Sequence, residues 1–102
     1  MKRDSKELQA IALSYEASKH AAPKVVAKGK GSVAAAIIEK AKQHDVPIQE
    51  DSSLVDLLSQ LQINETIPEQ LYQAVAEVFA FIYRVDKEYS NRTGVVQKNH
   101  PL

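Results

Sequence analysis

The run Gly29-Lys30-Gly31-Ser32 has the residue types of a phosphate-binding loop. A P-loop needs the pattern Gly-x-x-x-x-Gly-Lys-Ser/Thr, in which backbone N–H groups surround the phosphates and the hydroxyl reaches Mg²⁺. Here Lys24 stands where the first glycine is required, and Ser32 comes one position late. The spacing therefore favours a simpler structure, in which a strand ends at Ala27, a glycine turn follows and a helix begins near Ser32.

Metal ligands do not have the spacing of a known type of site. None of the histidines is followed three or four residues later by a second ligand; the histidines are His20, His44 and His100. We interpret His44 as the C-terminal residue of a helix, where the helix dipole favours it. An acidic cluster could hold a cation, but it coincides with a predicted helix start, where carboxylates are stabilised without a ligand. It comprises Glu50, Asp51 and Asp56.

Nucleophilic catalysis is not indicated either. The chain has no cysteine, and its serines lack the Gly-x-Ser-x-Gly pattern of a nucleophile elbow. Nucleic-acid binding would require a larger basic surplus with aromatic residues interleaved. We therefore expect a protein that is not an enzyme, needs no cofactor and binds no nucleic acid.

Length and composition fit one small globular domain. The chain has 102 residues, of which 44% are hydrophobic and 25% charged, with a net charge of zero. Residues 1–30 nevertheless carry seven basic and three acidic side chains, which leaves two alternatives: a basic surface for an acidic partner or membrane, or solvated lysines. Because there is no signal peptide or long apolar run, we expect a cytoplasmic protein without direct membrane insertion.

The hydrophobic pattern predicts short strands that suggest a sheet, together with amphipathic helices. We expect strands over 10–15, 24–27 and 46–50, with Pro47 at a strand start or an edge. The spacing of Val33, Ile37 and Ala41 predicts a helix that ends near His44. Residues 1–9 and 90–102 are expected to be flexible, so that 10–89 form the domain.

Two capping boxes mark further helices, Ser53-x-x-Asp56 before a leucine-rich segment and Thr66-x-x-Glu69 with Pro68 in the first turn. The second helix should run to about Tyr89 and carries two apolar rows. The first row is Leu71, Val75, Val78 and Ile82, and the second is Tyr72, Ala76, Phe79 and Tyr83. The second row could be core or an exposed patch for a partner peptide or helix, and the pattern leaves both alternatives open.

The segments AIALSYE, AAPKVVAKG, VPIQE and IPEQLYQAVAEVFAFIYR occur in an order that resembles one family. They are similar to the C-terminal cytoplasmic domain of FlhB, the flagellar type III export switch protein, and its injectisome relatives. The resemblance runs from about Ala10 to Arg84. It implies an α/β fold, a single domain with a small central sheet of short strands surrounded by helices, in which the Val-Val-Ala-Lys-Gly segment is structural. It also places the chain near the short, free-standing FlhB-like proteins.

The family cleaves itself at Asn-Pro-Thr-His, where the Asn side chain cyclises onto its own backbone carbonyl. The aligned positions in this chain are Ser5, Lys6, Glu7 and Leu8, and the sequence contains no Asn-Pro pair. The resemblance therefore predicts no self-cleavage, in a chain that resembles the fragment left after cleavage.

The family also binds export substrates in an apolar depression, whose positions match Ala22, Pro23, Ala76 and Phe79 here. With Tyr72 and Tyr83 from the same helix row, these residues form the expected partner-binding site. The family often has Leu where this chain has Phe79.

The expected function is a non-enzymatic protein-binding module of flagellar or type III protein export. Its partners would be export substrates of the rod and hook class or export-gate proteins at the cytoplasmic face of the membrane apparatus. A truncated FlhB-like fragment is a further partner, if AIALSY is an unpaired edge strand that adds to it. The alternative function is a cytoplasmic scaffold or regulatory protein that keeps the fold without a role in secretion.

Overall fold

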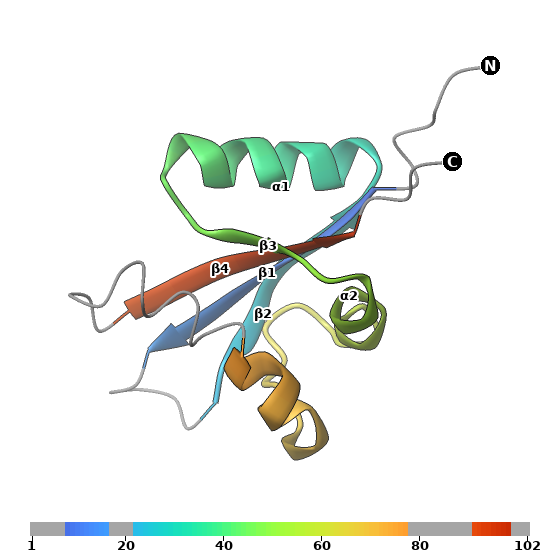
Figure 1. The fold of residues 1–102 in the computed structure, drawn as a ribbon, viewed down its shortest axis with the longest axis vertical. Helices are drawn as coiled ribbons and strands as arrows, with labels where there is room; N and C mark the ends of the chain where they lie inside the picture. Colours follow the sequence, from blue (N-terminus) through green and yellow to red (C-terminus); the bar gives the residue numbers. More distant parts are fainter. Residues whose placement is uncertain (1–7, 17–21, 78–90, 99–102) are drawn as a thin grey trace.

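The computed structural model describes residues 8–16, 22–77 and 91–98 (Figure 1). Four strands form one mixed sheet in the order β2-β1-β4-β3. They are β1 (Gln9–Glu16), β2 (Lys24–Lys30), β3 (Ile48–Glu50) and β4 (Asn91–Lys98). The helices are α1 (Ser32–Gln43), α2 (Ser52–Leu58) and the 3₁₀ turn η2 (Glu69–Leu71), after which 72–77 are α-helical. The α/β fold with a small central sheet is confirmed.

Helices cover both faces of the sheet (Figure 1). In β1 alternate side chains point to opposite faces, so Ile11 and Leu13 join the larger core cluster with α2. Ala10 and Ala12 point the other way and pack against α1 in the smaller cluster. Small side chains on both sides of this contact let α1 approach the sheet closely. Ala27 belongs to β2, and Ala34 and Ala41 belong to α1.

The expectation that no regular structure follows Ser90 is wrong for 91–98. These residues form β4, which pairs antiparallel with all of β1 and parallel with β3. Val95 is 3% exposed and Val96 is fully buried, one in each core cluster. Only Val95 and Val96 in this segment are apolar, and Gly94 precedes them, so 91–98 show neither the alternation nor the apolar run that indicates a strand.

The expectation that AIALSY is an unpaired edge is also wrong. β1 contains this segment and lies between β2 and β4, so neighbours occupy both of its edges. The edges of the described sheet are β2 and β3. Pro47 immediately precedes β3, which agrees with its predicted place, and its carbonyl accepts a hydrogen bond from the Val95 N–H at 3.0 Å.

β2 continues beyond Ala27, where the sequence predicted its end, through Gly29 to Lys30. Gly31 then turns the chain with a φ of 60° and a ψ of −127°, a conformation that glycine adopts without strain. The predicted helix follows as α1, and His44 is its C-cap residue as predicted. Its Nδ1 lies 3.0 Å from the carbonyl oxygen of Lys40.

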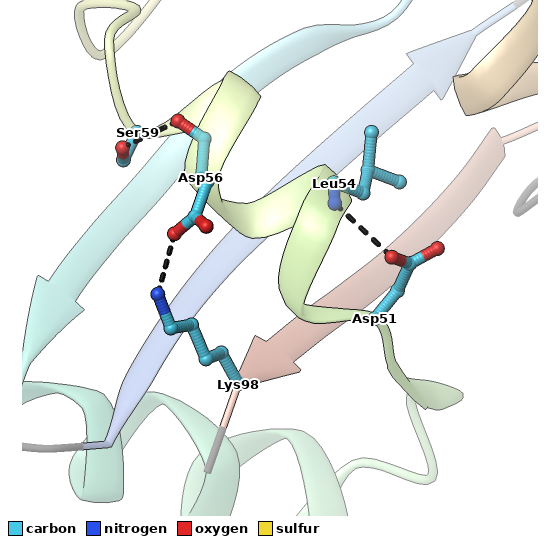
Figure 2. Close-up of polar contacts among 5 residues, drawn as sticks. All are labelled: Asp51, Leu54, Asp56, Ser59 and Lys98. Atoms are coloured by element: carbon cyan, nitrogen blue, oxygen red, sulfur yellow. Dashed lines mark hydrogen bonds and ion pairs between the residues drawn. The ribbon is translucent and has the colours of Figure 1, made fainter. Parts of the chain in front are cut away.

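Neither predicted capping box forms. Asp51 is the N-cap of α2, and its carboxylate accepts a hydrogen bond from the Leu54 N–H at 3.1 Å (Figure 2). Pro68 is the N-cap of η2, without a side-chain cap, and Thr66 instead pairs with Lys24 in an isolated bridge. The part of the last helix predicted for 78–89 lies outside the described residues.

Candidate functional site

The predicted partner-binding residues come from two segments that meet at the start of β2. Ala22 is 3% exposed and Pro23 half-buried. The carbonyl of Pro23 accepts a hydrogen bond from the Ile67 N–H at 2.8 Å. Because Ile67 lies two residues before η2 and next to its N-cap Pro68, this bond holds the start of the last helix beside the Ala-Pro segment.

The two rows of the last helix differ in burial where the structure describes them. Val75 is 1% exposed and Leu71 packs against the same core cluster, so the first row faces the core. Tyr72 is 45% exposed and Ala76 is also exposed. These two residues therefore do not belong to the core. Phe79 and Tyr83, the other members of the second row, lie outside the described residues.

Two exposed apolar residues near the same point were missed by the sequence analysis. Val26 is 37% exposed, and Ile63 is 50% exposed in the turn before η2. That turn is tied to β2, because the Asn64 N–H donates to the Val25 carbonyl at 2.6 Å and the Val25 N–H donates to the Glu65 carbonyl at 3.0 Å. Nothing in the local pattern marks this contact, since Val25 and Asn64 are far apart in the sequence.

Val26 is exposed at a β-bulge. The pairing between β1 and β2 shifts register between Ala12 and Leu13, which face Ala27 and Val25 and leave Val26 as the extra residue. Such bulges re-aim side chains at sheet edges. We use the name β2-edge surface for five of the exposed or half-buried residues on these joined segments, Pro23, Val26, Ile63, Tyr72 and Ala76.

The lysine before the glycine run has a structural partner. The Lys28 ammonium donates hydrogen bonds to the backbone carbonyls of Ser59, at 3.1 Å, and Leu61, at 2.5 Å. Ser59 is the C-cap of α2, where carbonyls lack helical partners and favour a cation. The side chain thus fastens the end of α2 to β2, which agrees with the structural role implied for this segment.

We expect Lys28→Met to destabilise the domain by about 1–2 kcal/mol, because two half-buried carbonyls lose a charged donor while the chain length is kept. The matched control is Lys30→Met two residues along the same strand, since Lys30 is exposed and should contribute less than about 0.5 kcal/mol. Urea unfolding of the wild-type chain and of both variants measures these changes in the free energy of unfolding. Equal midpoints would contradict the fastening role of Lys28.

Two carboxylates of the acidic cluster, those of Asp51 and Asp56, have separate structural roles (Figure 2). Asp51 caps α2, and the Asp56 carboxylate forms an ion pair with Lys98 of β4 at 2.5 Å. Among the described residues, no three His, Cys, Asp or Glu side chains gather in a group that could hold a metal ion. His20 and His100 lie outside the described residues.

A groove of about 270 Å³ lies between α1 and the sheet, on the face opposite α2. Ala12, Ala27 and Val95 line it from the sheet, and Ile37 and Ala41 line it from α1. Lys40 and His44 are its charged or titratable lining residues. A lining of this kind, which is mostly aliphatic, suits an apolar side chain.

Within 8–16, 22–77 and 91–98, the structure contains no helix with the length and apolar character needed to cross a membrane.

Comparison with known proteins covers most of the chain. The sequence model of the FlhB HrpN YscU SpaS family matches residues 8–82. The uncharacterized protein YlqH of Bacillus subtilis is 48% identical over 92 residues, which cover 90% of this chain and 99% of YlqH. The flagellar biosynthetic protein FlhB of Yersinia enterocolitica is 40% identical over 90 residues, 87% of this chain and 23% of that protein.

FlhB of Bacillus subtilis is 38% identical over 80 residues, 78% of this chain and 22% of FlhB. The chain thus spans less than a quarter of the length of these two FlhB proteins. The family match includes the segments AIALSY and PKVVAKG, on which the resemblance was based, and the last predicted helix as far as Ile82. By this match and these identities, the chain belongs to the FlhB HrpN YscU SpaS family.

Proposed function

We propose that this chain is a non-enzymatic protein-binding module of the flagellar or type III protein export apparatus. Family membership is the observation that carries this proposal, because several relatives are named as flagellar biosynthetic proteins. The module would act in the cytoplasm, at the face of the membrane apparatus. It would bind export substrates or export-gate proteins.

We assign the binding site to Ala22, Pro23, Tyr72, Ala76, Phe79 and Tyr83, with the exposed residues Val26 and Ile63 added to it. Two features support this assignment. The start of the last helix is fixed beside Pro23 by the Ile67 hydrogen bond, and Tyr72 presents an aromatic ring that is 45% exposed. Aromatic side chains supply much of the binding energy at protein interfaces.

The test is a calorimetric titration with early flagellar export subunits of the rod and hook class. We expect binding by the wild-type chain and at least a tenfold loss of affinity for Tyr72→Asp, because a charge in an apolar interface loses its hydration. Val33→Asp is the matched control: Val33 is 55% exposed on α1, on the opposite face of the sheet, and should leave the affinity unchanged. Circular dichroism checks that both variants are folded.

Absence of binding to these subunits and to export-gate proteins would overturn the proposal. It would favour a scaffold or regulatory role that keeps the fold without a part in secretion. Equal loss of affinity for Tyr72→Asp and Val33→Asp would contradict the assigned site while leaving the export function standing.

We also expect the chain to remain uncleaved. Cyclisation needs the side-chain amide of an asparagine, and Ser5 at the aligned position has no nitrogen in its side chain. The mass of the purified protein, measured after prolonged incubation at neutral pH, should equal that of the intact sequence. Two fragments with a break near residue 5 would contradict this prediction.

A further inference from the structure

The groove between α1 and the sheet, which we name the α1 groove, has a volume of about 270 Å³ and lies under the C-terminal half of the helix. It exists because Ala12, Ala27 and Ala41 meet there, where larger side chains would fill the space. Ala27, Ala12 and Val95 lie directly opposite one another on β2, β1 and β4. The floor of the groove is therefore apolar across three strands.

A polar row borders this floor further along the strands. Ser14 lies two residues beyond Ala12 in β1, so its side chain points to the same face of the sheet. Ser14 pairs with Thr93 of β4 and with Lys24 of β2, and directly opposite residues share a face. Thr93 is exposed and lines the groove. The apolar floor is thus followed by two hydroxyl groups and an ammonium group.

Basic side chains border the α1 groove. Lys40 lines it from α1 and is exposed, and His44 follows one turn later on the same side of the helix. Glu39 and Asp45, the acidic residues next to these two in the sequence, do not line the groove. Lys24 adds a second ammonium group on the polar row. An anion at the mouth of the groove would therefore be attracted by lysines from two elements.

The size and shape of the groove favour a side chain presented by another protein over a free small molecule. Sites for small ligands are usually clefts of about 300–1,000 Å³ that enclose most of the ligand. The α1 groove is smaller than this and is open to solvent along one side. A bulky side chain can enter such a groove while the segment that carries it stays on the surface.

We propose that the α1 groove is a docking site for a short segment of another protein, in which one bulky apolar side chain is flanked by carboxylates. The apolar side chain packs over Ala12 and Ala27, and a carboxylate reaches Lys40 at the rim. Burial of apolar area supplies the affinity, and the charges fix the direction of the segment. This inference is independent of the proposed export function, because the last helix with Tyr72 packs on the opposite face of the sheet.

The test uses three synthetic peptides of the sequence Gly-Ser-Glu-Glu-X-Glu-Glu-Ser-Gly, in which X is Leu, Phe or Trp. Each is titrated to millimolar concentration into the ¹⁵N-labelled full-length chain, and the amide signals are followed by two-dimensional NMR. We expect saturable shifts at Ala12, Ala27, Ile37 and Ala41 with at least one peptide, and no comparable shifts at Tyr72. Absence of saturable shifts with all three peptides would overturn the proposal.

A pair of charge reversals on α1 tests recognition of the carboxylates. Lys40→Glu should weaken binding by about threefold or more, because it places a negative charge at the mouth of the groove. Lys42→Glu is the matched control, since Lys42 lies in the same last turn and is also exposed but does not line the groove. At physiological salt it should change the affinity by less than about twofold. Equal losses in the two variants would contradict the carboxylate contact.

Filling the groove tests the apolar contact. Ala27→Leu adds a branched side chain to the floor and should abolish the shifts, while the remaining NMR signals show that the variant is folded. Unchanged binding to this variant would place the peptide elsewhere and overturn the proposal. A wild-type dimer in sedimentation experiments that Ala27→Leu converts to monomer would assign the groove to a second copy and overturn the assignment to another protein.

Discussion

Replacing Val96 with Asp is expected to remove most of the stability of the domain. Val96 is fully buried in the larger core cluster and lies directly opposite Ile11 of β1. An aspartate there must either bury its charge or take up a proton, and a buried unpaired charge costs several kcal/mol. Since small domains have a total stability of about 5–15 kcal/mol, the variant should be largely unfolded or close to it at room temperature.

Urea unfolding followed by circular dichroism measures this loss. The matched control is Thr93→Asp in the same strand, because Thr93 is exposed and the same charge stays in water there. We expect the control to lose about 1 kcal/mol or less, the usual range of strand propensity. If both variants kept the wild-type midpoint, the central place of β4 in the sheet would be contradicted.

The second large effect is expected at Gly29, where α1 crosses β2. A Cβ atom added to Gly29 would collide with the Cγ1 methyl of Val33, and it would lie 2.8 Å from the Cβ and 3.3 Å from the backbone carbonyl carbon of that residue. These distances are shorter than ordinary carbon–carbon contacts, so Gly29→Ala must push α1 away from the sheet. Overpacking of this kind costs about 2–3 kcal/mol.

A double-mutant cycle separates this contact from other effects of losing a glycine. Val33 is 55% exposed, so Val33→Ala should by itself change the stability by less than about 1 kcal/mol. In the Gly29→Ala background the same change removes the methyl groups that collide, and we expect it to recover about 1 kcal/mol. Additive free energies of unfolding would show that the cost at Gly29 has another origin.

The candidate site was predicted in part by the sequence. The 3.6-residue period of the helix predicted two apolar rows in the last helix. The structure shows that they differ in burial, since Val75 of the first row is buried and Tyr72 of the second row is exposed. The pattern could not decide which row is covered, because that depends on the direction in which the helix meets β2. The bond from Ile67 to Pro23 sets this direction, and it joins residues 44 positions apart. Val26 and Ile63 were missed for the same reason.

The glycine run shows how local sequence can suggest the wrong chemistry. Lys28 and the glycines look like parts of an anion site, yet their environment is made of backbone carbonyls and a neighbouring helix. The spacing argument against a P-loop relied on short-range geometry alone. The partners of Lys28 came only from the tertiary structure, since Ser59 and Leu61 lie more than thirty residues away.

The sequence by itself determined the elements in which the spacing of apolar residues within one segment indicates which side chains are buried. These are the apolar strand β1, the amphipathic helix α1 with His44 at its end, and β3 after Pro47. Only the tertiary structure decided that 91–98 fill the middle of the sheet, that β1 is interior and that Asp56 pairs with Lys98. Strand order and long-range ion pairs depend on which distant segments meet, and the period of side chains within one segment carries no information about its neighbours.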